Sequence, residues 1–199
     1  MAIRNIVNSL RGISAYQVRS ISTSAKFLPV IQASNSNQQR YNLYWLNQDI
    51  ARICKDYRHQ YAITLARHQL AKYITYSNPM DWANWIQYSV DKYTKIQVVH
   101  PLSSAYTIYL LNWLPGQASP IHGHPPGGCI MGVLRGTLEE TIYPMCKPSV
   151  YNKQIRILTP GVIGYINDSI GFHSIGNLCN TPCNSMHIYF HNKPDAINQ

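Results

Sequence analysis

The chain has 199 residues, a length that predicts one domain and at most two. Hydrophobic residues make up 45% of the chain and charged residues 13%, which supplies enough apolar material for a core and excludes a globally disordered protein. No stretch approaches the roughly 18 uninterrupted apolar residues of a transmembrane helix, so we expect no membrane insertion.

The net charge of +9 is concentrated near the N-terminus. Four of the nine excess positive charges lie in the first 26 residues, on Arg4, Arg11, Arg19 and Lys26, and no acidic residue precedes Asp49. The chain has no cluster of five or more Lys and Arg residues, which a nucleic-acid-binding segment usually carries. The sequence therefore argues against nucleic acid as a partner.

The first 26 residues have the composition of a targeting segment, because they are rich in Arg and Ser and contain no acid. Their apolar residues fall on one face of a predicted helix: Ile3, Ile6, Val7 and Leu10. The stretch 18–24 resembles the end of a mitochondrial presequence, and the apolar core is too short for a secretory signal. We expect a presequence over 1–26 and a mitochondrial matrix location. The alternative is an ordinary tail on a cytoplasmic protein.

A polar linker rich in Gln, Asn and Ser is predicted over 27–42, and a small helical part over 43–92. Apolar residues recur at helical spacing up to about Ile74. Asn78 and Pro79 then form a turn before a further helix start, where Trp82, Trp85 and Ile86 share a face.

Residues 93–193 are predicted to form a β-barrel or sandwich, because short β-rich runs alternate with Gly- and Pro-containing turns. The expected runs lie at 105–111, 119–124, 129–134, 137–143, 150–158, 162–167, 172–175 and 185–190.

The five cysteines are an odd number at irregular spacing: Cys54, Cys129, Cys146, Cys179 and Cys183. This pattern predicts no disulfide framework and favours a reducing compartment.

His122 and His124 are the first residues that suggest chemistry. They flank Gly123 in a predicted strand, where side chains two residues apart point to the same face. Two imidazoles on one face form a natural metal chelate, although surface pairs of this kind are common.

The surrounding residues make the signal more specific. Gly-x5-His-x-His-x4-Cys-x6-Gly runs from Gly116 to Gly136, and a second pattern from Gly161 to Asn177 contains His173. Together they resemble the two motifs of cupins, small jelly-roll-like barrels that hold a metal inside. Cys129 stands where most cupins have an acidic ligand, as in the cysteine dioxygenase branch.

Further stretches resemble the cysteine dioxygenase family itself, over residues 43–193. They are Val133–Thr141, Tyr165–Gly171 followed by His173, and the Ser-x-His-x-Tyr pattern of Ser185, His187 and Tyr189. The resemblance implies a mainly β, cupin-type barrel with a small N-terminal helical part.

By position, the resemblance implies that His122, His124 and His173 hold iron(II). Such a ligand set leaves open positions on the metal and its full charge, which would keep a substrate thiol deprotonated. Cys129 and Tyr189 match the pair that forms a thioether crosslink in animal-type enzymes.

Ser185, His187 and Tyr189 alternate along one predicted strand and share a face. His187 is therefore expected to hold the Tyr189 phenol, and Ser185 to orient His187.

Lys95 departs from the family pattern, because it stands where well-known members place an Arg for the substrate carboxylate. A Lys keeps the charge but loses the planar two-point contact. Tyr93 is expected to add a second hydrogen bond to the carboxylate.

The function implied is oxidation of the L-cysteine thiol by O2 to cysteine sulfinate, in cysteine catabolism towards hypotaurine and taurine. Alternatives are a dioxygenase of another small thiol acid such as 3-mercaptopropionate, an oxidase of N-terminal cysteine on proteins, and a non-catalytic metal-binding cupin. The expected partners are only the small-molecule substrate and O2, and the protein is expected to be a monomer.

Overall fold

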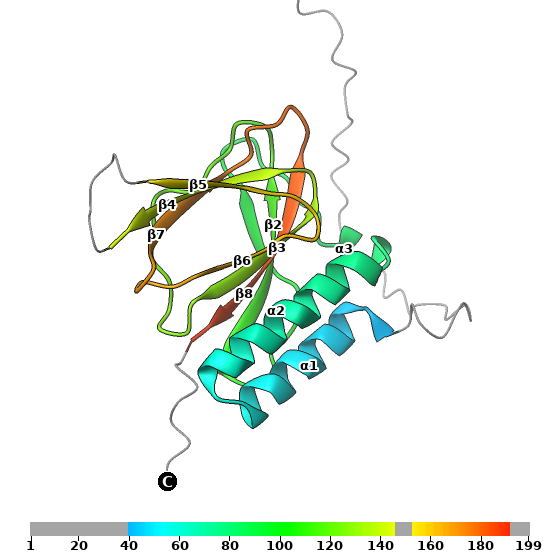
Figure 1. Cartoon of the computed structure of the whole chain (residues 1–199). Coiled ribbons are helices and arrows are strands. Elements are labelled where there is room, and N and C mark those ends of the chain that lie inside the picture. Colours follow the sequence, from blue (N-terminus) through cyan, green and yellow to red (C-terminus); the bar gives the residue numbers. More distant parts are fainter. Residues whose placement is uncertain (1–39, 146–152, 192–199) are drawn as a thin grey trace, which may run out of the picture. The chain divides into compact units, whose positions relative to one another are not determined.

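The structure is a computed structural model, described here for residues 40–145 and 153–191. The presequence predicted over 1–26 and most of the linker predicted over 27–42 lie outside these ranges. In the described part the chain begins with helices and continues as a β-structure of eight strands (Figure 1).

Two long helices, α1 (Leu43–Asp56) and α2 (His59–Tyr76), precede a short α3 (Met80–Ala83). The Asn42 side chain accepts a hydrogen bond from the Trp45 backbone N–H at 2.9 Å, which caps the start of α1. The stretch predicted as helical is thus divided in two, because the backbone is extended at Tyr57 and Arg58.

Asp81 links α1 to α2 through hydrogen bonds. Its Oδ2 accepts hydrogen bonds from the Leu43 backbone N–H at the start of α1 and from the Tyr73 hydroxyl near the end of α2, both at 2.7 Å. Trp82 beside it is buried, whereas Trp85, which was predicted to share its face, is 37% exposed.

Eight strands form two antiparallel sheets. The strands are β1 (Thr94–Gln97), β2 (Tyr106–Trp113), β3 (Cys129–Arg135), β4 (Leu138–Pro144), β5 (Gln154–Leu158), β6 (Ile163–Ile166), β7 (Gly171–Gly176) and β8 (Cys183–Phe190). One sheet has the order β1-β2-β8-β3-β6 and the other β5-β4-β7. Strand β1 was not among the predicted runs.

The strand predicted over 119–124 is wrong. That segment makes only isolated bridges to β7, between Ala118 and Gly176 and between His122 and His173.

Side-chain alternation gives the five-stranded sheet two different faces. One face packs against α1 and α2, as Figure 1 shows, and forms a continuous core. The sheet contributes Tyr106, Ile108, Leu110, Ile130, Met186, Ile188 and Phe190 to this core, and the helices contribute Leu46, Ile50, Ala66, Leu70 and Tyr73. Burying each large apolar side chain stabilises the fold by about 1.5–3 kcal/mol. The opposite face is left for the interior between the sheets.

The mainly β, cupin-type architecture with a small N-terminal helical part is therefore confirmed. Among the residues that the structure describes, none of the helices combines the length and apolar character needed to cross a membrane.

Candidate metal centre and substrate pocket

His122 and His124 come together with His173, which lies about fifty residues further along the chain. One ring nitrogen from each of them lies within 4.8 Å of those of the other two. His173 is a buried residue of β7, and its backbone exchanges two hydrogen bonds with His122, with N···O distances of 2.9 and 3.1 Å. This bridge, in place of the predicted regular strand, holds the first motif against the second.

Gly123 permits the close approach of the two neighbouring histidines to the second motif. A Cβ at this position would lie 2.7 Å from both Asp168 Oδ1 and Phe172 Cε1. The same Asp168 oxygen accepts the His124 backbone N–H at 2.7 Å. A glycine between the histidines is therefore required by packing.

The hydrogen bonds of the rings direct their other nitrogens into the centre. His122 Nδ1 lies 2.9 Å from the Pro120 carbonyl oxygen, and His173 Nδ1 lies 2.8 Å from Glu140 Oε1. Since both oxygens accept, each Nδ1 carries the proton and each Nε2 keeps a free lone pair.

His124 completes the donor set. It is buried, and neither ring nitrogen has a hydrogen-bond partner among the described residues. An unpaired buried imidazole is costly unless a ligand satisfies it. A metal ion held by the three histidines would satisfy this ring, because imidazole suits Zn, Cu, Fe and Ni.

Burial also keeps the rings ready to bind a metal. It lowers the pKa of His124 to about 3, with the neighbouring imidazoles adding to the effect. Burial lowers the pKa of His122 as well. Both rings are neutral near neutral pH, which is the form that coordinates metals.

Sequence reasoning missed Glu140, although it lies within the quoted stretch 133–141. Its side chain is fully buried between the sheets. The available signal was its position: an acid alternating with Leu138 and Ile142 on the apolar face of a predicted strand.

A second row of polar side chains lies on the interior face of the five-stranded sheet. The Trp113 indole N–H donates to Ser185 Oγ at 3.0 Å, and Ser185 Oγ lies 2.9 Å from His187 Nε2. Ser185 therefore lies where it can orient His187. Trp113 is fully buried and also fixes Ser185.

The structure gives His187 a different second partner from the expected Tyr189 phenol. His187 Nδ1 lies 3.9 Å from Cys129 Sγ, while the rings of His187 and Tyr189 lie nearly parallel with centroids 6.3 Å apart. Burial lowers the pKa of His187 and raises that of Cys129.

Cys129 and Tyr189 lie directly opposite each other in the β3–β8 pairing. Opposite residues of an antiparallel pair point to the same face, and the two side chains pack in one cluster. The preceding turn brings Cys129 there: Gly128 has φ +80° and its N–H bonds to the Pro125 carbonyl. Burial raises the pKa of the Tyr189 phenol.

Lys95 is an exposed residue of β1 whose ammonium group reaches into the pocket. Its Nζ lies 3.9 Å from the ring centroid of Tyr189 and 4.3 Å from that of Tyr109. Desolvation lowers the pKa of Lys95. Tyr93 stacks on Trp113 with centroids 4.4 Å apart.

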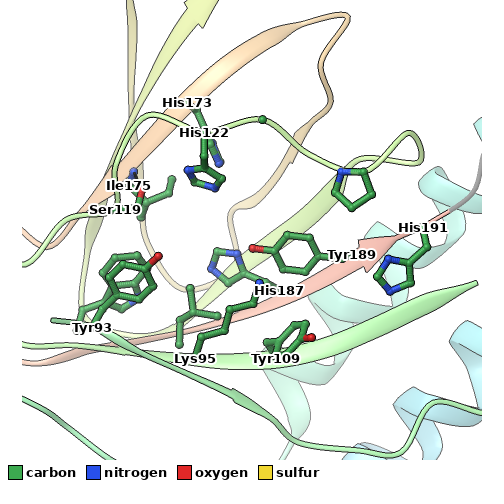
Figure 2. Close-up of a pocket in the computed structure, with 14 residues that line it drawn as sticks. Tyr93, Lys95, Tyr109, Ser119, His122, His173, Ile175, His187, Tyr189 and His191 are labelled. Atoms are coloured by element: carbon green, nitrogen blue, oxygen red, sulfur yellow. Dashed lines mark hydrogen bonds between the residues drawn. The ribbon is translucent and has the colours of Figure 1, made fainter. Parts of the chain in front are cut away.

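One cavity of about 340 Å³ lies between the sheets, and its walls include His122, His173, His187, Tyr189, Lys95 and Tyr93. Figure 2 shows His122 and His173 on one side of it and Lys95 and Tyr109 on the other. His191 also lines the cavity, with Nε2 2.6 Å from Thr107 Oγ1.

Comparisons with known proteins point to one family. The family model described as cysteine dioxygenase type I matches residues 48–196. Cysteine dioxygenase type 1 of Bos taurus is 35% identical over 117 residues, and that of Homo sapiens 33%. Each match covers 57% of this chain and 58% of the relative, so the chain matches little more than half of their length.

Solved structures are more distant. A protein from Thermus thermophilus is 21% identical with a TM-score of 0.46, over 55% of this chain and 93% of its own. A cupin superfamily protein from Desulfitobacterium hafniense is 14% identical with a TM-score of 0.45, over 58% and 92% of the two chains.

Proposed function

The chain belongs to the cysteine dioxygenase type I family, and on that premise we propose that it is an iron(II)-dependent dioxygenase. The reaction proposed is oxidation of the thiol of L-cysteine by O2 to cysteine sulfinate. The observation that carries the proposal is the pairing of a three-imidazole centre with a lysine ammonium across one cavity.

The metal would be held by His122, His124 and His173, whose unprotonated nitrogens converge. Iron(II) bound there would supply the electrons for O2 activation and a charge that stabilises a thiolate. Without a carboxylate among its ligands, the centre would keep its full positive charge. Glu140 is held away from this role because its Oε1 bonds to His173 Nδ1 and its Oε2 pairs with Arg156.

Lys95 would bind the substrate carboxylate, and Tyr93 would donate a second hydrogen bond to it. Both side chains line the cavity with the histidines, so an amino acid could reach both groups at once. At about 340 Å³ the cavity lies at the small end of the roughly 300–1,000 Å³ range of small-molecule pockets, which fits a substrate as small as cysteine.

The Cys129–Tyr189 pair would form a thioether crosslink between Sγ and a carbon of the phenol ring. Their opposite positions in β3 and β8 support this proposal. The step removes two protons and two electrons, which O2 would accept. Locking the phenol would fix the wall of the cavity on which Lys95 rests.

The remaining proposals rest on the family resemblance and on the composition of the N-terminal segment. The chain would act as a monomer in cysteine catabolism towards hypotaurine and taurine. Its acid-free segment 1–26 would direct it to the mitochondrial matrix.

Oxygen uptake by the iron-loaded protein tests the function. Cysteine should support uptake with about one O2 consumed per sulfinate formed, and zinc-loaded protein should be inactive. A higher kcat/KM with 3-mercaptopropionate would favour the other thiol acid. No uptake with either thiol from protein that has bound iron would contradict the dioxygenase proposal and favour a non-catalytic cupin.

A further inference from the structure

Glu140 is a fully buried carboxylate placed directly behind one of the three histidines. It lies in the middle of β4, the central strand of the three-stranded sheet, which Figure 1 shows between β5 and β7. Its Oε1 accepts the His173 Nδ1 proton at 2.8 Å. Its Oε2 accepts from Arg156 Nε at 2.8 Å and also pairs with Arg156 Nη2.

The register of the sheet imposes this contact. Arg156 of β5 lies directly opposite Glu140, and His173 is two residues from Ile175, the residue opposite Glu140 on β7. The side chains of Arg156, Glu140 and His173 therefore share the interior face. The arrangement is a chain of three groups that runs from a partly exposed guanidinium to the proposed metal ligand.

The free-energy cost of burying the Glu140 carboxylate indicates that this residue has a role beyond packing. Moving an ionised carboxylate out of water costs several kcal/mol, and a well-packed apolar residue would avoid that cost. The neighbouring Glu139 has no such partners: it is half-buried on the other face of β4, and its side chain accepts only a long 3.5 Å contact from Thr141 among the described hydrogen bonds.

We propose that Glu140 is a positioning residue of the metal centre and that Arg156 holds it in place. The inference rests on the proposed metal site. The carboxylate fixes the His173 tautomer with the proton on Nδ1, so that Nε2 faces the metal, and it sets the orientation of the ring. The two-point contact of Arg156 prevents the carboxylate from rotating away and balances its charge.

Binding of Co(II) to the metal-free full-length protein tests this proposal without relying on turnover. Glu140→Gln should weaken Co(II) affinity about 10- to 100-fold, the range expected for a lost partner of a ligating histidine. The visible absorption of the bound Co(II) should also shift, because His173 loses its fixed orientation. Glu139→Gln is the matched control on the same strand, and its affinity should stay within about twofold of wild type.

Variants of Arg156 provide a second test. The Arg156 side chain is partly exposed to solvent, so its replacement should disturb the fold less than replacement of Glu140. Arg156→Met should weaken Co(II) binding, and Arg156→Lys should restore part of the loss because it keeps the charge but not the two-point contact. This graded response is not expected from a residue that only supports the fold.

Three outcomes would overturn the role proposed for Glu140. Wild-type affinity and spectrum in folded Glu140→Gln would overturn the inference and leave the metal site standing. If Glu140→Gln does not fold, wild-type affinity in Arg156→Met overturns it in the same way. A wild-type protein that binds no Co(II) or iron(II) would overturn both this inference and the proposed function.

Discussion

Lys95 is the residue whose replacement tests substrate recognition most directly. Lys95→Met removes the ammonium group but keeps most of the methylene stem that rests against Tyr109 and Tyr189. If the ammonium binds the substrate carboxylate, a charge-assisted hydrogen bond worth about 1.5–3 kcal/mol is lost. We therefore expect kcat/KM for cysteine to fall about 10- to 150-fold, mostly through KM.

The assay compares cysteine with cysteamine, which has the same thiol and amine but no carboxylate. Cysteamine turnover should change little in Lys95→Met, so the preference for cysteine should nearly disappear. Lys92→Met is a matched control, because Lys92 is an exposed lysine three residues earlier. Lys95→Arg should retain or improve cysteine turnover if the cavity has room for the planar guanidinium.

Metal content must be measured in every variant, since Lys95 lines the same cavity as His122 and His173. Iron binding should not change, because the ammonium is not a ligand. An equal loss of kcat/KM for cysteine and cysteamine at full iron content would refute the assignment. Another cation would then have to bind the carboxylate.

Three further predictions concern stability, the crosslink and location. Because the pKa of His124 is about 3 in the fold against 6.5 for an unperturbed histidine, acid favours the unfolded chain. The metal-free protein should lose about 2 kcal/mol more stability than His124→Gln between about pH 7.5 and about pH 5, measured by urea unfolding; equal losses would contradict the burial argument. Active protein should contain a Cys129–Tyr189 crosslink that Cys129→Ser abolishes with reduced but measurable turnover; peptide mapping after turnover that finds only free residues would count against it. A reporter fused to residues 1–26 should enter mitochondria and be cut within 19–26, whereas a cytosolic reporter that keeps Met1 would exclude the presequence.

Local patterns predicted the framework of the fold well. Short β-rich runs between Gly- and Pro-containing turns located β2, β3, β4, β6, β7 and β8 to within a few residues. Helical spacing likewise located α1 and α2, although it did not predict the extended backbone at Tyr57 and Arg58. Strand β1 was missed because its four residues are too few to show a period.

The candidate site was predicted less completely, for a physical reason. The three histidines could be assigned because their spacing matches known motifs, but the segment 119–124 looked like a strand that it is not. Its conformation depends on the His122–His173 bridge and on Asp168, both of which are contacts with a distant part of the chain. Glu140 and Arg156 gain their neighbours in the same way, through strand register that no local pattern specifies.

The proposed functional residues come from both sheets. His173 and Glu140 belong to the three-stranded sheet, whereas Lys95, Tyr109 and Tyr189 belong to the five-stranded sheet that α1 and α2 support. A cysteine bound as proposed would join the two sheets, with its thiol toward the histidines and its carboxylate toward Lys95. On that proposal, the distance between the sheets would set which thiol acids reach both ends. The helices pack on the outer face of β2, β3 and β8, so their core supports the sheet that carries Lys95.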